Sequence, residues 1–323
     1  MHIMSYYSHR SPTRRPKLRL KLLLPAVFLV ILGVYVFIAT HTPEAPAIQE
    51  IQSESTILIP RYDMSSVTMS TTGQAAVAVI EEAMNIHSSG DQLWPMASIT
   101  KVITALAILQ KAPITPGEQG DTIILNQQDE DYYWDYAALL GTLTPVTAGL
   151  EMTQYEALQT MLLASSNNMT DTLVDRYFAD REEYLSFANN LLARYGLEHT
   201  RVADTTGFSP DSVSTPTEMI KLGKIALDNP IIADIVAQPS ASPRVSGLIP
   251  NYNSLINEPG VTGIKPGLTD ESGHNLLFSV ESTNKDGDPV TIVAVVMGFF
   301  DSQQFRTTSH TILQESQEIA ATQ

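Results

Sequence analysis

The sequence contains no cysteine, and only 17% of its 323 residues are charged. Without thiols, the protein has no disulfide bonds, no thiolate metal ligands and no cysteine nucleophile. The seven histidines are scattered along the chain and none forms an H-E-x-x-H pair, which argues against a zinc hydrolase of that type. Any catalytic chemistry must therefore be built from hydroxyl, amine, amide and carboxyl groups.

Basic residues are few, and they are unevenly placed. Residues 1–21 hold six of the 19 Lys and Arg residues and no acid, which leaves 13 cations against 35 Asp and Glu in the rest of the chain. An acidic body of this kind repels the phosphate backbone of nucleic acids. We therefore expect no nucleic-acid partner.

The basic tail, residues 1–21, is followed by an uncharged apolar run at 22–40. That length spans a bilayer as a helix, and the preceding cations predict that the tail stays in the cytoplasm. Residues 41–73 are rich in Pro, Ser, Thr and Glu and predict an extracytoplasmic linker. The alternative is a cleaved signal peptide processed at 45–47, but the run exceeds the usual apolar length of about 7–15 residues. We therefore expect a single-pass signal anchor in the cell membrane, and both alternatives place the body outside the cytoplasm.

Residues 74–323 combine two apolar periodicities. The pattern predicts strands at 75–80, 261–265, 274–283 and 290–299. It predicts helices at 94–111, 153–164, 170–178, 181–195, 218–227 and 309–320, the last with Ser309 as its N-cap. Strands near both chain ends and helices between them favour an α/β (α+β) fold. We expect a mainly antiparallel sheet flanked by helices, with an all-helical subdomain inserted at about 115–240.

A serine and a lysine three residues apart, Ser98 and Lys101, stand near the start of the first predicted helix. Residues at this spacing share a helix face, so a neutral Lys101 could take the Ser98 proton and make it a nucleophile. Burial, the positive helix end and a second nearby cation would each favour the neutral amine. The alternative is a solvated polar pair on an ordinary amphipathic helix, and S-x-x-K alone is a common pattern.

Two helical patterns meet at the segment LLASSNNMTD, residues 162–171. A serine and an asparagine two residues apart could point into one cleft, the serine relaying a proton and the asparagine holding a substrate amide. Two registers fit, Ser165 with Asn167 or Ser166 with Asn168. A helix-capping loop is the alternative, since Ser and Asn are favoured there.

The segment VTGIKPGLTDESGHN, residues 261–275, places Lys265 at a predicted strand. Beside a cleft, this lysine would supply a second cation and bind a carboxylate. Gly267 would let a substrate backbone approach closely. A plain turn at a strand edge is the alternative interpretation of the Pro and Gly.

In this order, the three segments resemble the S-x-x-K, Ser-x-Asn and Lys-Thr-Gly motifs of penicillin-interacting serine enzymes. The chain resembles the low-molecular-mass penicillin-binding proteins, the serine-type D-alanyl-D-alanine carboxypeptidases. The resemblance extends from about residue 75 to the end of the chain and implies the DD-peptidase/β-lactamase-like fold. It rests on PMASITKVITAL from Pro95, LLASSNN from Leu162, YGLEHTRVADTTGFS from Tyr195 and GIKPGLTDESGHN from Gly263. The leucine pair at 162–163 matches the family's apolar pair when the serine is Ser165, so Ser165 with Asn167 is preferred.

The resemblance also implies roles and partners. The implied site consists of Ser98 as acylated nucleophile, Lys101 as general base, Ser165 and Asn167 in proton relay and substrate positioning, Lys265 on the substrate carboxylate, Gly267 at the substrate backbone, and the N–H groups of Ser98 and Leu268 as oxyanion hole. The implied substrate is the D-Ala-D-Ala end of a peptidoglycan stem peptide, and β-lactams are the implied covalent inhibitors. No metal or organic cofactor is required.

The chain departs from the family at Pro266, where the pattern has threonine. The change deletes a hydroxyl and a backbone N–H, and Thr269 is expected to compensate in part. Three alternatives remain beside the carboxypeptidase. They are a class A β-lactamase, which is disfavoured because no E-x-x-L-N pattern follows Asn167, a DD-endopeptidase of the same family, and a non-catalytic peptidoglycan or β-lactam binder.

Overall fold

A computed structural model describes residues 29, 32–33, 61–81 and 83–323. The fold below is that of the unit formed by residues 58–323. The predicted anchor at 22–40 lies almost wholly outside the described residues. Within those residues, no helix combines the length and apolar character that crossing a bilayer requires.

A five-stranded antiparallel sheet organises the body. Its strands lie in the order β2-β1-β11-β10-β9, so β9 is an edge strand and the first and last strands of the chain meet at the centre. Their bounds are β1 Gln74–Val79, β2 His87–Ser88, β9 Val261–Thr269, β10 Gly273–Thr283 and β11 Pro289–Phe299. The prediction of an antiparallel sheet built from both chain ends is confirmed.

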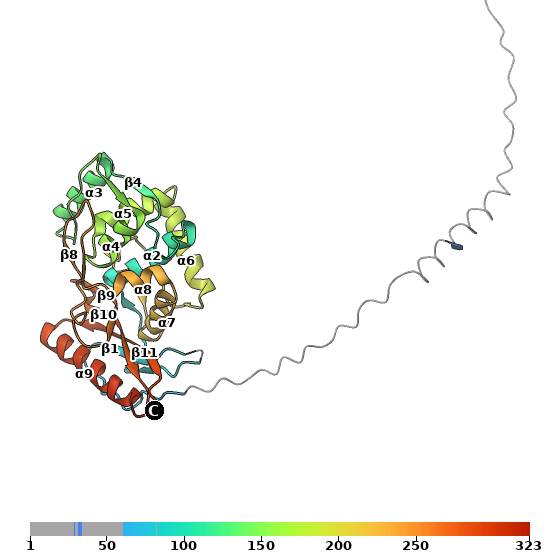
Figure 1. The fold of residues 1–323 in the computed structure, drawn as a ribbon, viewed down its shortest axis with the longest axis vertical. Helices are drawn as coiled ribbons and strands as arrows, with labels where there is room; N and C mark the ends of the chain where they lie inside the picture. Colours follow the sequence, from blue (N-terminus) through green and yellow to red (C-terminus); the bar gives the residue numbers. More distant parts are fainter. Residues whose placement is uncertain (1–28, 30–31, 34–60, 82) are drawn as a thin grey trace, which may run out of the picture. The chain divides into compact units, whose positions relative to one another are not determined.

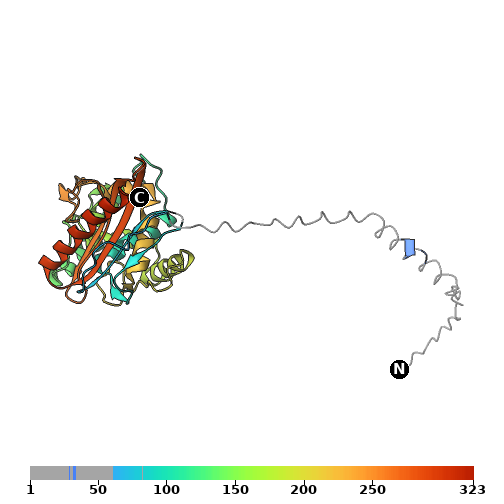
Figure 2. The same cartoon turned by 90° about the horizontal axis from the view of Figure 1, so that it is seen from below.

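The two faces of the sheet pack against different helices. Side chains of β1 alternate, with Ala75 and Val77 facing α9 (Ser302–Ala320) and Ala76 facing the helical part of the molecule. Figures 1 and 2 show α9 lying across the sheet near the carboxyl end of the chain. Helix α7 (Pro216–Leu227) packs on β1, β10 and β11 from the opposite side.

The remaining helices gather at one end of the body, drawn from teal to yellow-green in the upper part of Figure 1. Their bounds are α2 Thr100–Lys111, α3 Gln127–Ala138, α4 Gln154–Leu162, α5 Asn167–Tyr177 and α6 Arg181–Arg194, with α8 Pro230–Val236 between this group and the sheet. Short paired strands complete the body: β3 Trp94–Pro95 with β6 Val213–Ser214, β4 Thr122–Ile124 with β5 Glu151–Thr153, and β7 Ser240–Ala241 with β8 Ile249–Pro250.

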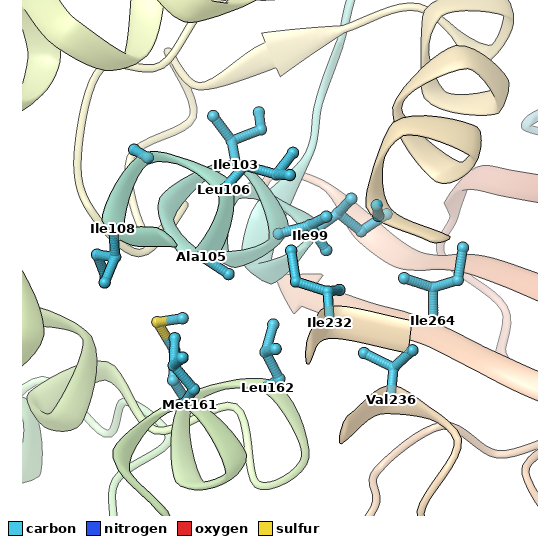
Figure 3. Packing of buried hydrophobic residues seen from close by; sticks show 14 of the residues in the cluster. Ile99, Ile103, Ala105, Leu106, Ile108, Met161, Leu162, Ile232, Val236 and Ile264 are labelled. Atoms are coloured by element: carbon cyan, nitrogen blue, oxygen red, sulfur yellow. The ribbon is translucent and has the colours of Figure 1, made fainter. Parts of the chain in front are cut away.

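Helix α2 is the buried centre of the molecule. Figure 3 shows Ala105 and Ile108 of α2 on the side that faces Met161 of α4, with Ile232 of α8 and Ile264 of β9 near the start of the helix. Fully burying a side chain of this size stabilises the fold by about 1.5–3 kcal/mol. The start of α2 is therefore fixed between the helical group and the sheet edge.

Three expectations about the domain organisation need correction. The linker prediction extended too far, because Tyr62, Met64 and Val67 are buried in the core beneath α9. The inserted subdomain is not all-helical, because the β4–β5 pair lies within it. Its predicted carboxyl boundary was too late, since α7 packs on the sheet.

The two predicted helices at 94–111 and 309–320 also begin elsewhere. Trp94 and Pro95 form a strand because the Trp94 indole donates to the Ser272 carbonyl (2.8 Å) and these tertiary contacts outweigh helix periodicity. Helix α9 begins two turns earlier than predicted, since Asp301 caps it by accepting from the backbone N–H groups of Gln303 and Gln304. Ser309 is a buried residue within that helix and not its N-cap.

Candidate active site

The Ser98 hydroxyl lies at the entrance to α2, on a short 3-10 turn from Ala97 to Ile99. Ala97 has a positive φ of 48°, an uncommon conformation for a residue with a side chain, which turns the chain sharply just before Ser98. Because α2 continues directly from this turn, Lys101 follows on the same face, and its Nζ lies 2.8 Å from the Ser98 Oγ.

The Lys101 amine is fully buried and has three polar neighbours. Besides Ser98, its Nζ donates to Asn167 Oδ1 at 2.7 Å and to the Thr206 carbonyl at 2.9 Å. Burial lowers the pKa of Lys101 to about 7, while the carboxylates of Asp204 and Asp171 oppose that shift. A large share of the lysine is therefore neutral near pH 7.

Of the two serine–asparagine registers, one reaches Lys101 and the other is turned inward. Ser165 lines the cleft that holds Ser98, with φ at 58°, and Asn167 begins α5 beneath it. Ser166 caps α5 by accepting from the Met169 N–H, and its hydroxyl donates to Asn168 Oδ1 at 2.7 Å.

Asn168 has a purely architectural set of contacts. Its side-chain amide donates to the Thr144 carbonyl (3.0 Å), and its Oδ1 accepts from the Thr144 N–H (3.0 Å). The asparagine therefore ties the 139–150 loop to the start of α5. The geometry places Ser165 and Asn167 at the site and gives Ser166 and Asn168 a role in holding it.

Alanine substitutions of the two neighbouring serines are expected to affect different properties, the acylation rate for Ser165 and the stability for Ser166. Ser165→Ala removes a hydroxyl from the cleft and should slow acylation by a fluorescent penicillin while leaving the melting temperature nearly unchanged. Ser166→Ala removes a helix cap and should lower the free energy of unfolding by about 1–2 kcal/mol. The acylation rate of folded Ser166→Ala should stay close to that of the wild type.

Labelling rates and denaturant unfolding of both variants measure these effects directly. The reverse pattern, with Ser166→Ala slow and stable and Ser165→Ala fast, would assign the site to the other register.

Strand β9 brings a second lysine to the site from far along the chain. Lys265 is fully buried, and burial together with the nearby Lys101 charge holds its pKa well below the ordinary lysine value. Its Nζ donates to the Pro266 carbonyl at 3.2 Å. The effect of the Lys101 charge on Lys265 places the two amines in the same buried region, between α2 and the edge strand β9.

The residues that follow Lys265 on β9 form one wall of the cleft. A Cβ on Gly267 would lie 2.8 Å from the Met96 carbonyl oxygen and 3.1 Å from the Ser98 nitrogen, so only glycine allows the strand to approach the nucleophile turn this closely. Leu268 comes next and lines the cleft with an exposed side chain.

Thr269 does not reach the cleft. Its hydroxyl and backbone N–H both contact the Ser272 hydroxyl, at 3.1 and 3.0 Å, and thereby close the turn between β9 and β10. The expectation that Thr269 compensates for the missing threonine hydroxyl at Pro266 is therefore wrong. Pro266 itself costs the sheet little, because β9 is an edge strand.

The cleft has a volume of about 370 Å³. Its lining includes seven residues to which the motif analysis gave no role: Thr142, Tyr252, Ser254, His274, Asn275, Phe305 and Arg306. These residues come from loops, from the start of β10 and from the first two turns of α9, and the tertiary fold sets their positions. No local pattern in the sequence marks them. Among the described residues, no group of three or more His, Asp or Glu side chains is arranged to hold a metal ion.

The loop 204–208 packs against the nucleophile turn and supplies the Thr206 carbonyl that accepts a hydrogen bond from Lys101. Its Gly207 has φ at 79°, and a Cβ there would lie 1.8 Å from the Ala97 carbonyl oxygen. Any side chain at Gly207 would displace the nucleophile turn. The sequence analysis noted this segment as part of a longer resemblance but gave none of its residues a role.

Residues 64–301 match the model of the D-alanyl-D-alanine carboxypeptidase family of peptidases, and the chain belongs to that family. Among curated relatives, a D-alanyl-D-alanine endopeptidase of Haemophilus influenzae is 26% identical over 197 residues, covering 59% of this chain and 64% of the relative. A D-alanyl-D-alanine endopeptidase of Pseudomonas aeruginosa is 25% identical over 214 residues, with 64% of each chain covered. The chain thus spans somewhat less than two thirds of the length of these relatives.

Solved structures show the same fold. The Streptomyces K15 DD-transpeptidase aligns with a TM-score of 0.65 at 18% identity, covering 77% of this chain and 98% of that one. A D-alanyl-D-alanine carboxypeptidase from Mycobacterium tuberculosis aligns with a TM-score of 0.66 at 21% identity, covering 79% and 95%. The α+β DD-peptidase fold expected from the sequence is confirmed.

Proposed function

We propose that the protein is a serine D-alanyl-D-alanine carboxypeptidase that trims peptidoglycan stem peptides through an acyl-enzyme on Ser98. The observation that carries this proposal is the contact between the buried Lys101 amine and the Ser98 hydroxyl at 2.8 Å. A neutral amine has two N–H donors and one lone pair. With the donors directed to Asn167 Oδ1 and the Thr206 carbonyl, the lone pair faces the serine proton.

Acylation begins when the Ser98 oxygen attacks the carbonyl carbon of the penultimate D-alanine. Lys101 takes the hydroxyl proton, so the oxygen becomes a strong nucleophile as the new bond forms. The resulting ammonium ion is stabilised by its three oxygen neighbours and by the carboxylates of Asp171 and Asp204. Collapse of the tetrahedral intermediate expels D-alanine, whose amine receives a proton by way of Ser165.

Charge developing on the substrate oxygen needs donors placed in advance. The backbone N–H groups of Ser98 and Leu268 are assigned this role, because the missing Cβ of Gly267 lets β9 lie directly against the nucleophile turn. The terminal carboxylate of the peptide is assigned to Lys265, which lies buried behind Pro266; an approaching carboxylate would favour the ammonium form of this lysine. Water then attacks the acyl-enzyme, with Lys101 again accepting the proton, and releases the shortened peptide.

Restoring the family threonine, Pro266→Thr, is expected to raise kcat/KM for a stem peptide by about tenfold to a hundredfold. A hydrogen bond to a charged group contributes about 1.5–3 kcal/mol, and neither Thr269 nor any other hydroxyl of β9 faces the cleft to replace it. Steady-state kinetics of the two proteins measure the gain. Pro266→Ala is the matched control, because it restores the backbone N–H without the hydroxyl.

An increase seen equally in Pro266→Ala would assign the effect to the backbone. No increase in either variant would mean that the carboxylate is held elsewhere in the cleft.

A DD-endopeptidase is the second candidate, and the names of the relatives favour it. Three of them are endopeptidases, from Haemophilus influenzae, Pseudomonas aeruginosa and Escherichia coli, while one from Bacillus subtilis is a carboxypeptidase. Both reactions use the same acyl-enzyme and differ in the amine that leaves. The Ser98 chemistry is therefore common to the two candidates.

Mass spectrometry of two substrates separates them. The full-length protein is incubated with a stem pentapeptide and, separately, with a cross-linked stem dimer. Loss of one alanine from the pentapeptide is the expected result, and cleavage of the dimer alone would establish the endopeptidase. Intact peptides together with stable penicillin labelling would indicate a non-catalytic binder.

The cellular location is part of the proposal. Residues 22–40 would anchor the protein in the cell membrane, with the catalytic body outside the cytoplasm, where peptidoglycan lies. The uncharged length of that segment and the six cations before it support this orientation. Membrane fractionation with protease accessibility of the body tests it.

A further inference from the structure

The segment LLASSNNMTD, which contains the Ser-x-Asn motif, ends in a carboxylate, Asp171. In the reaction described above, Asp171 does not contact the substrate. Asp171 lies one helical turn after Asn167, so the two side chains share a face of α5. Asn167 contacts Lys101 directly. Asp171 is 1% exposed, which is rare for a carboxylate and calls for a specific reason.

The contacts of Asp171 lead to the catalytic lysine through one loop. The Thr205 hydroxyl donates to Asp171 Oδ1, and the carbonyl of the next residue, Thr206, accepts from Lys101 Nζ at 2.9 Å. Thr205 is held from its other side too, since its carbonyl accepts from the Thr104 hydroxyl of α2 at 2.7 Å. The carbonyl that orients Lys101 therefore sits on a segment whose position depends on Asp171.

The other oxygen of Asp171 is bound from the helices that flank it. The Tyr136 hydroxyl of α3 donates to Asp171 Oδ2 at 2.9 Å, and Arg181 Nη2 of α6 donates to the same oxygen at 2.6 Å. Burial raises the pKa of Asp171, and the Arg181 charge and these donors oppose that shift. Four elements, α3, α5, α6 and the 204–208 loop, thus converge on this one carboxylate.

We propose that Asp171 is a positioning residue for the catalytic base: it anchors the Thr205–Thr206 segment so that the Lys101 amine points at Ser98. The same carboxylate places a negative charge near that amine. The inference rests on the proposed function for its catalytic meaning. It adds a residue that touches neither substrate nor nucleophile.

The charged and titratable groups around Lys101 define how its protonation responds. Three act on Lys101 itself, Asp171 on α5, Asp204 in the loop and Lys265 on β9. Three more act through these carboxylates: Tyr136 on α3 and Arg181 on α6 contact Asp171, and Tyr184 on α6 lies near Asp171 and Asp204. Asp171 and Asp204 favour the ammonium form of Lys101, while burial and a charged Lys265 would favour the neutral amine. Removing the Asp171 charge leaves Arg181 uncompensated, so both changes lower the pKa of Lys101.

The first test compares Asp171→Asn with Asp175→Asn in the full-length protein. Asp175 lies one turn further along α5, is exposed and accepts a hydrogen bond from the Tyr132 hydroxyl; within the described part of the chain it has no hydrogen bond to the 204–208 loop, so it undergoes the same charge change without the link to Lys101. The readouts are the pH dependence of acylation by a fluorescent penicillin and the pKa of Lys101 from NMR of isotope-labelled lysine. Asp171→Asn should lower that pKa, and the acid limb of acylation, by about 1 pH unit. Asp175→Asn should move neither.

A purely structural role predicts something different. Asp171→Asn would then lower the acylation rate by one factor at every pH and leave the limb in place. That result, or an equal shift in Asp175→Asn, would overturn the proposal.

The second test separates the hydrogen bond from the charge and does not depend on the folding of Asp171→Asn. Thr205→Val deletes the donor to Asp171 and should slow acylation above the limb by about tenfold. Thr205→Ser keeps the hydroxyl and should restore the wild-type rate. A Thr205→Val protein that acylates at the wild-type rate would overturn the positioning role.

Failure of the proposed function is distinguishable from failure of this inference. The lysine titration needs no turnover, so a wild-type protein that penicillin does not acylate would contradict the Ser98 chemistry alone. The shift of the Lys101 pKa between wild type and Asp171→Asn would still decide the role of Asp171.

Discussion

Replacing Ser98 by alanine is expected to reduce hydrolysis of a stem pentapeptide by roughly 10⁴-fold or more and to abolish covalent labelling by penicillin. Both reactions require the oxygen that forms the acyl bond, and removal of the nucleophile in serine hydrolases leaves only the rate enhancement from binding and oxyanion stabilisation. Quantitative product analysis and gel fluorescence measure the two losses.

The matched control is Ser254→Ala, which removes a hydroxyl from the same cleft at an exposed position without a catalytic assignment. This variant should keep most of the turnover. Ser98→Ala should remain folded, because only one hydrogen bond, that to Lys101, is lost. Residual labelling of Ser98→Ala at the wild-type rate would place the nucleophile elsewhere.

The acylation rate is expected to rise with pH through about 7 and to level off above it. Lys101 must lose its proton before it can act as a base, and burial lowers its pKa to about 7. Stopped-flow or rapid-quench labelling across the pH range gives the limb. An acid limb near the ordinary lysine pKa of about 10.4 would mean that Lys101 is not the group that titrates.

Lys101→Arg is the control for this dependence. Arginine retains the cation and much of the volume, but it stays protonated at every accessible pH. Loss of a general base costs about 10²–10⁴-fold in rate, so the labelling rate of Lys101→Arg should be lower than that of the wild type by a factor in this range. Its pH dependence should show no limb near pH 7. A variant that keeps both the rate and the limb would remove Lys101 from the mechanism.

The same lowered pKa sets the sign of a stability effect. Between about pH 7 and the unfolded lysine value near 10.4, the unfolded chain holds a proton that folded Lys101 has released. The contribution of Lys101 to the free energy of unfolding therefore rises with pH across this window. Below about pH 7 the folded protein must bury an ammonium ion, and the contribution is lowest there.

Much of the sheet could be predicted from the sequence because its strands have clear local patterns of apolar residues. β10 and β11 are long apolar segments joined by the Asp286–Gly287 turn, and the structure confirms both within one residue at each end. Helices α4 to α7 were also located within a few residues. Each of them begins at a polar N-cap, such as Thr153 or Asp180, that precedes an apolar repeat.

The missed boundaries have tertiary causes. The N-terminal segment around Tyr62 reads as a linker because it is short and polar, yet its few apolar side chains fill the space under α9. Helix α3 is mostly polar and lacks a strong apolar face, so only its capping box, Asn126 with Asp129, marks it. Neither the N-terminal segment nor α3 has a periodic pattern of apolar residues from which it could be predicted.

The candidate site divides in the same way. Ser98 and Lys101 could be paired from their spacing, because residues three positions apart on a helix lie on the same face. The addition of Lys265, more than 160 residues away, required the resemblance to a known family. Asp171 and Arg306 lie in the same neighbourhood, but their positions follow from packing that no short motif records.

The central claim is that Ser98, and no other serine of the cleft, forms the acyl bond. Tandem mass spectrometry of the protein after reaction with benzylpenicillin tests it directly, because the adduct can be located on a single residue. We predict one penicilloyl group per chain, on the peptide that contains Ser98 and Lys101. An adduct on Ser165, or none on a folded protein, would contradict the account.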